Sequence, residues 1–151
     1  TVIDYAAANN KELENFYPAF KAVKDYVVQA PEKTTGWYLP SIGQWYDFTA
    51  NLGGLPSWDD AINEGNDLTP NLYRWSNQTE LVSKINAYFE PLGTGNYDAI
   101  PNGSYQKFFS SSTYSDSGIW TWFVGKQANV VQCWHNVRYN SDSAVRPILA
   151  F

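Results

Sequence analysis

The sequence contains few of the residues on which catalysis and covalent cross-linking often depend. Its 151 residues include one cysteine, one histidine and no methionine. Cys133 cannot form an intramolecular disulfide, so packing alone must hold the fold together. We expect Cys133 to be a small core residue, with a reactive thiol as the alternative. The missing methionine, absent even at position 1, suggests a processed protein or a fragment that lacks its N-terminal part.

Long hydrophobic runs and clustered basic residues are also missing. No apolar run approaches the roughly 20 residues of a transmembrane helix, and the chain does not open with a signal-peptide pattern, so we expect no direct insertion into a membrane. The net charge is −5, with 13 acidic and 6 basic side chains in residues 1–103 against 2 acidic and 4 basic in residues 104–151. The small positive excess in the second part is too weak for phosphate binding, and nucleic acid is not an expected partner.

Aromatic residues, by contrast, are abundant. They make up 17% of the chain and include seven tryptophans and eleven tyrosines. Large rings that carry a polar group suit binding surfaces as well as cores. The length is typical of one domain and sufficient to bury a core without cross-links, so we predict a single domain over residues 1–151.

Helical patterns occupy the first two thirds of the chain. Apolar residues at helical spacing predict an amphipathic helix over residues 16–28. Its buried stripe would comprise Phe16, Phe20, Val23 and Val27. A second helix is predicted over residues 42–52, with Ser41 as its N-cap and Gly53–Gly54 as its stop. A third, which opens with a capping-box pattern, is predicted over residues 77–89.

Between and after the helices the patterns change. A strand is predicted at residues 36–40, where a bulky run ends at a proline. Residues 55–75 lack periodicity and predict an irregular loop, whose acidic residues do not follow the pattern of a calcium-binding loop. Short apolar runs separated by turn residues then predict strands at 105–109, 119–124, 130–134 and 144–150. Helices followed by a small antiparallel sheet with long loops indicate an α+β domain.

Four short phrases follow one another in a recognisable order. They are WYLPS at residues 37–41, FSSST at 109–113, IW at 119–120 and AVRPILAF at 144–151. Together they resemble phrases of the C-type-lectin-like domains at the C-termini of Bacteroidetes surface and fimbria-associated proteins, a group related to the Fibrobacter succinogenes major paralogous domain. The similarity spans roughly residues 36–151, with Phe109 where the family usually has tryptophan.

The resemblance implies a C-type-lectin-like fold in which these phrases are mostly structural. The expected core residues are Trp37, Leu39, Phe109, Val145, Ile148 and Leu149. The hydroxyl groups of Ser110, Ser111 and Ser112 are expected to bond turn amides. Arg146 is flanked by core residues and precedes a proline, so we expect it to bond buried carbonyls or a carboxylate, with contact to a ligand as the alternative.

The same region is similar to the variable segments of proteins diversified by retroelements, in which surface codons are hypermutated on a C-type-lectin-like scaffold. That similarity implies that residues between the core phrases are displayed on the surface for ligand binding. These are Tyr114, Ser115, Asp116, Trp120, Trp122, Gln132, Trp134, His135, Asn136, Tyr139 and Asn140. Trp and Tyr together with Ser and Asn are the mixture that antibody loops use. Trp120 and Trp122 share one face of a strand, which is either core or display, whereas the polar neighbours of Trp134 favour display.

Patterns of known chemistry are scarce. Every triad, multi-histidine metal site or Cys–His dyad would depend on His135, whose immediate context offers no orienting carboxylate. The calcium-dependent sugar motifs of C-type lectins are absent, because Glu90-Pro91-Leu92 lacks the amide and Trp134-His135-Asn136 lacks the carboxylate. We therefore expect no catalytic residue, metal ion or cofactor.

Together these observations predict a non-catalytic, calcium-independent ligand-binding or adhesion domain. Its C-terminal loops would face a protein or glycan ligand at a bacterial cell surface or in secreted form, beside neighbouring domains of a longer chain. The alternative from a different class is a structural subunit or interdomain module of a surface or pilus assembly, with the aromatic face buried against a neighbour. An enzyme would need a pocket around His135 with a carboxylate within hydrogen-bond reach.

Overall fold

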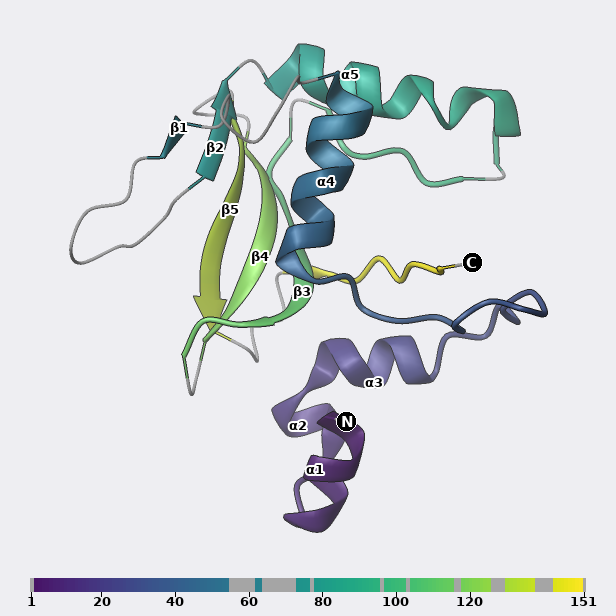
Figure 1. Ribbon diagram of the computed structural model, residues 1–151, viewed down its shortest axis with the longest axis vertical. Helices are drawn as coiled ribbons and strands as arrows, with labels where there is room; N and C mark the ends of the chain where they lie inside the picture. The colour runs from purple at the N-terminus through teal and green to yellow at the C-terminus, as the bar shows by residue number, and fades with distance from the viewer. Residues whose placement is uncertain are drawn as a thin grey trace.

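The computed structural model describes residues 2–54, 62–63, 73–76, 78–95, 97–102, 104–115, 118–125, 130–137 and 143–150. They form an α+β arrangement, as the sequence predicted (Figure 1). The helices are α1 (Val2–Ala8), α2 (Leu13–Phe16), α3 (Pro18–Lys24), α4 (Ile42–Gly53), α5 (Gln78–Ala87) and the 3-10 helix η2 (Glu90–Leu92). The strands are β1 (Ile62–Asn63), β2 (Tyr73–Ser76), β3 (Gln106–Thr113), β4 (Gly118–Gly125), β5 (Val130–Val137) and β6 (Ser143–Ala144).

The strands form one sheet in the order β1-β2-β5-β4-β3-β6. Its centre is the antiparallel meander β3-β4-β5, in which β4 and β5 pair along their whole length. Both edges differ from the prediction. β1 and β2 come from the segment predicted as a loop, and β6 is short and parallel to β3. Trp75 of β2 is buried in the core, a long-range contact that the periodicity of a four-residue strand does not reveal.

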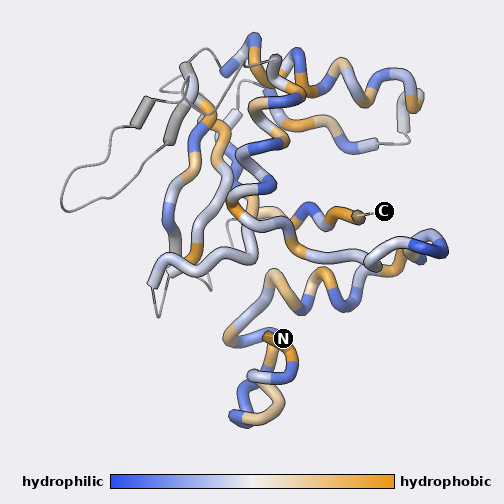
Figure 2. Tube along the Cα trace, viewed as in Figure 1, coloured by the Kyte–Doolittle hydropathy of each residue, from blue (hydrophilic) through white to orange (hydrophobic). Residues whose placement is uncertain are grey.

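The main core lies between the sheet and the helices α4 and α5. Its largest members are Trp45, Tyr46, Trp75, Leu81, Ile85, Ile100, Phe108 and Trp122. Hydrophobic and hydrophilic residues alternate along α5, as expected for a helix with one buried side (Figure 2). Cys133 belongs to the same core, as predicted, and is 1% exposed.

Local signals begin and end α4 where the sequence predicted. The Ser41 hydroxyl accepts a hydrogen bond from the Gln44 amide at 3.1 Å, and the Gln44 side chain accepts one from the Ser41 amide at 2.9 Å, which completes a capping box. The Ser112 hydroxyl accepts a bond from the Ile42 amide at 3.0 Å. This partner is an amide, but it belongs to the first residue of α4 and not to a turn as predicted for the FSSST serines. Gly54 ends the helix at φ 72°, in the left-handed region that glycine adopts easily.

A smaller core lies on the other face of the sheet. Successive residues of a strand point to opposite faces, so Phe109 and Ile119 turn away from the main core. They pack with Ala19 of α3 and with Leu39. The helix α3 therefore covers one end of this face.

The helix predicted over residues 16–28 is broken. Pro18 lacks an amide hydrogen and disfavours a helical conformation at the residue before it, and Tyr17 has φ −142° and ψ 58°. α2 ends before this break, and α3 ends at Lys24. Two residues predicted to be buried are exposed: Phe16 at 40%, in the short helix before the break, and Val27 at 93%, where no helix extends.

The strands predicted at residues 36–40 and 144–150 are mostly extended chain. Apart from β6, they meet in a single bridge, in which the backbones of Tyr38 and Ile148 exchange hydrogen bonds of 3.0 and 2.9 Å. Arg146 donates a hydrogen bond to the backbone oxygen of Asp98, as its position among core residues predicted. Of the predicted core residues, Leu39 and Phe109 are buried. The others, Trp37, Val145, Ile148 and Leu149, are half-buried.

Candidate functional site

Four of the predicted ligand-binding residues lie together at one end of the sheet. We call Tyr114, Trp120, Trp134 and His135 the aromatic cluster. The ring of His135 stacks on Tyr114 at 4.4 Å between centroids with an interplanar angle of 10°, and it lies 5.6 Å from the ring of Trp134 at 19°. Trp120 meets Tyr114 edge-on at 5.3 Å and 87°. His135 is thus the ring that contacts all three of the others.

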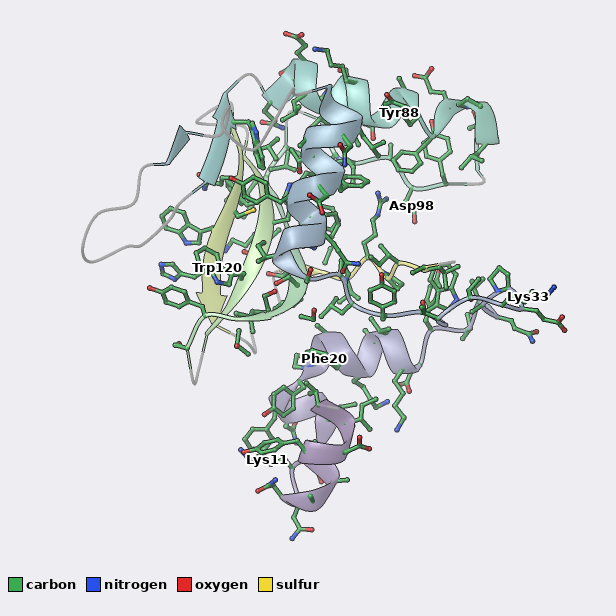
Figure 3. All side chains as sticks on the ribbon, in the orientation of Figure 1. Lys11, Phe20, Lys33, Tyr88, Asp98 and Trp120 are labelled. Atoms are coloured by element: carbon green, nitrogen blue, oxygen red, sulfur yellow. The ribbon has the colours of Figure 1, made fainter. Side chains whose placement is uncertain are left out.

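The β-sheet places these rings together. Trp120 of β4 and His135 of β5 are directly opposed in the antiparallel register, so their side chains share a face. Tyr114 follows β3, where its amide donates a hydrogen bond of 3.0 Å to the Gly118 oxygen and closes the connection to β4. The hydroxyl of Ser110 donates to the Trp120 oxygen at 2.6 Å and ties β3 to β4 nearby. Figure 3 shows Trp120 near the N-terminal end of α4.

The edge of β5 links the cluster to the opposite face of the sheet. β2 pairs with β5 only from Val130 to Gln132, so among the described strands the outer edge of β5 is unpaired beyond that point. Trp134 alternates with His135 and belongs to the opposite face, yet the two rings lie close together at this edge. Trp134 is 38% exposed, a high value for a tryptophan within a strand.

A shallow hollow of about 280 Å³ adjoins Trp134 on that opposite face. Its lining residues are Tyr105, Lys107, Phe123, Gln132 and Trp134. The Tyr105 and Phe123 rings meet edge-on at 4.9 Å, and the Lys107 ammonium lies 5.3 Å from the centre of the Tyr105 ring. The predicted residues Gln132 and Trp134 therefore meet three residues that sequence reasoning missed. Alternation along each strand could have suggested them, but only the register between strands brings them together.

Trp122 is not part of this surface, and its prediction as a ligand-binding residue is corrected. Its side chain is 0% exposed and stacks on Trp45 of α4 at 4.9 Å. Trp120 and Trp122 do share a face, as their alternation requires. The helix α4 covers the face at Trp122 and leaves Trp120 half-buried near its N-terminal end.

Other predicted binding residues lie outside the described residues. These are Asp116, Tyr139, Asn140 and the side chain of Asn136. Ser115 is described and exposed.

The cluster consists of four aromatic rings, each of which carries a polar group. Among the described residues, no group of three His, Cys, Asp or Glu side chains could hold a metal ion. Burial raises the pKa of the Cys133 thiol, which disfavours the thiolate that a Cys–His pair would need. What the described rings offer is flat area and the polar edges of an imidazole and a phenol.

Comparison with protein-family models, curated proteins and solved structures found no match. The resemblance to C-type-lectin-like domains and to diversified proteins therefore stays a prediction. Within the described segments, no helix is long and apolar enough to cross a membrane.

Proposed function

We propose that the protein is a non-catalytic recognition domain and that the aromatic cluster, with the hollow beside it, is its ligand-binding surface. The observation that carries this proposal is that the His135 ring contacts the rings of both Tyr114 and Trp134 at a place where Trp134 remains 38% exposed. Rings held by their neighbours lose little conformational entropy on binding, and aromatic residues contribute strongly to interfaces.

The proposed ligand is a protein or a glycan, met at a bacterial cell surface or by a secreted form of the chain. Both ligand classes use the same chemistry, because apolar side chains and sugar rings can lie flat on exposed indole and phenol groups. Calcium plays no part in this proposal, which relies on ring contact together with hydrogen bonds to Gln132, His135 and the tyrosines. A C-type-lectin-like scaffold and diversification of the surface belong to the same proposal.

A binding screen with one exposed ring removed tests this function. Wild-type protein and Trp134→Ala are compared on glycan arrays and against a panel of surface proteins, with Tyr88→Ala as the matched control. Tyr88 is a 60% exposed aromatic residue beyond the end of α5 and outside the cluster. We expect Trp134→Ala to weaken binding about tenfold or more and Tyr88→Ala to leave it unchanged. Equal binding by all three proteins would contradict the proposal.

The second candidate is a structural module of a surface or pilus assembly, with the exposed segment after α3 in place of the predicted aromatic face as the surface that meets the neighbour. A run of exposed apolar residues favours it, since Tyr26, Val27 and Val28 are 43%, 93% and 50% exposed. Such a run is typical of a surface that another protein or domain covers. In this case Val27→Asp would prevent assembly with the neighbouring subunit, as measured by size-exclusion chromatography of the two together, and Trp134→Ala would not.

A further inference from the structure

A second cavity lies away from the aromatic cluster. It is a cleft of about 590 Å³, within the range of small-molecule sites. Its walls come from the segment before α4, from α4 itself, from the chain after α5 and from the C-terminal segment. In Figure 3, Asp98 lies between α5 and that C-terminal segment. None of the four cluster residues lines the cleft.

Two pairs of rings form apolar walls of the cleft. Phe89 and Tyr97 are nearly parallel, with centroids 5.9 Å apart and an interplanar angle of 27°. Tyr26 and Trp37 meet edge-on at 5.1 Å and 88°. The indole N–H of Trp37 donates a hydrogen bond of 2.6 Å to the Val28 oxygen, which fixes the orientation of that ring. A ring-shaped ligand would therefore find flat, oriented surfaces in the cleft.

Arg146 supplies the positive charge of the cleft. Its guanidinium lies 6.0 Å from the centre of the Phe89 ring and 5.9 Å from that of Phe108, and it donates a hydrogen bond to the Asp98 backbone oxygen. Desolvation lowers the pKa of Arg146, while the Asp98 carboxylate acts in the opposite direction. A guanidinium has five N–H donors. Among the described residues, one of them bonds the Asp98 backbone oxygen, and others remain for a ligand to accept from.

We propose that this cleft binds a small ligand that carries a carboxylate on a six-membered ring. The carboxylate pairs with Arg146, whose planar group matches a carboxylate in a two-point contact, and the ring lies against the aromatic walls. The described lining holds one cationic residue, Arg146, and one acidic residue, Asp98, so the proposed selection of an anion rests on direct pairing with Arg146. Two sources share this chemistry: the acidic sugar unit of a glycan and an aromatic acid.

Chemical-shift perturbation of the folded chain tests the proposal. The probes are glucuronate and benzoate, with glucose and benzyl alcohol as neutral counterparts, each up to about 10 mM, a weak-binding limit for a small ligand. We expect at least one acid to shift the Trp37 indole signal and the amides of Asp98 and Arg146, and the neutral probes to leave them in place. A response to glucuronate alone identifies an acidic sugar, and a response to benzoate alone an aromatic acid. No response to either acid, or an equal response to the neutral probes, overturns the proposal.

Variants that change one charged side chain show whether Arg146 binds the acid or only supports the fold. We expect Arg146→Gln to weaken acid binding at least about tenfold, with Lys107→Gln, which removes the cation of the hollow, as the control. Circular dichroism shows whether Arg146→Gln folds. Asp98→Asn keeps the backbone acceptor and removes the competing carboxylate, so it should tighten acid binding about two- to fivefold. Unchanged or weaker binding by Asp98→Asn overturns the proposal even if Arg146→Gln fails to fold.

This site is independent of the proposed recognition surface. Trp134→Ala should leave acid binding in the cleft unchanged, because Trp134 does not line it. The two proposals can therefore fail separately.

Discussion

The indole rings of Trp45 and Trp122 lie almost parallel, with centroids 4.9 Å apart and an interplanar angle of 3°. One belongs to α4 and the other to β4, so this stack joins the helix to the centre of the sheet. Trp122 also donates its indole N–H to the Thr49 hydroxyl at 2.7 Å, and Thr49 in turn donates to the Trp45 oxygen at 2.8 Å. Because that acceptor is the backbone oxygen of Trp45, this buried polar connection orients the Trp122 ring and ties it to the backbone of α4. The Trp45 ring is oriented by a different bond, which its indole N–H donates to the Phe109 oxygen at 3.0 Å.

Removing the Trp122 ring should be among the most destabilising changes in the chain. Trp122→Ala leaves a large cavity between α4 and the sheet, and we expect the free energy of unfolding to fall by about 3–5 kcal/mol. Urea denaturation followed by circular dichroism measures the loss. Tyr88→Ala, which removes a 60% exposed ring, should cost about 0.5 kcal/mol or less. Similar losses for both variants would contradict the assignment of Trp122 to the core.

The Thr49 hydroxyl should be worth more than its size suggests. Thr49→Val keeps the shape of the side chain but leaves the Trp122 N–H without its acceptor, and we expect a loss of about 1–3 kcal/mol in unfolding free energy. Thr49→Ser retains the hydroxyl and should recover part of that loss. If the Thr49 side chain acted only by packing, Thr49→Ser would lose more unfolding free energy than Thr49→Val.

The capping box at Ser41 should contribute measurably to α4. In Ser41→Ala the Gln44 amide loses its acceptor, so we expect a loss of about 0.5–2 kcal/mol in unfolding free energy. Ser41→Asp provides another acceptor and a favourable charge at the helix N-terminus, and it should be close to wild type. Equal destabilisation by both substitutions would show that the cap contributes through something other than this hydrogen bond.

The buried thiol of Cys133 should be inert in the folded protein and should make stability depend on pH. Burial raises its pKa, so the unfolded chain releases the thiol proton first as pH rises. The unfolding free energy should therefore fall above the unfolded thiol pKa of about 8.5, by up to about 1.4 kcal/mol per pH unit. Denaturation at pH 8.0 and 9.5 measures this slope. Cys133→Ala should lack it, and iodoacetamide should label wild type only after unfolding.

Local sequence signals were sufficient for α4 and for the central strands. Ser41 and Gly54 act within a few residues of the helix ends, so their roles were predicted from spacing alone, whereas the part of Gln44 in the capping box was not. The runs that became β3, β4 and β5 were also predicted, although each observed strand is longer than its run. The break at Tyr17 is a different case, because the local rule for Pro18 was available and the helical spacing of Phe16 and Phe20 obscured it.

The candidate site depended more on tertiary structure. Alternation showed that Trp120 and Trp122 share a face, but only the position of α4 decides which of them is covered. The hollow requires the register of three strands, which the sequence does not specify by itself. Arg146 was correctly predicted to bond a carbonyl, yet the cleft around it combines segments that no sequence window contains together.

The bridge between the C-terminal segment and the chain before α4 also bears on the order of folding. The amide of Ala150 donates to the Thr35 hydroxyl at 3.1 Å across 115 residues of sequence. Closing so long a loop costs entropy that few local contacts offset, so we expect this contact to form after the β3-β4-β5 meander. During synthesis, residues 35–38 leave the ribosome early but have no pairing partner until residues 148–150 follow. The cleft, which takes walls from both segments, should therefore be among the last parts of the protein to assemble.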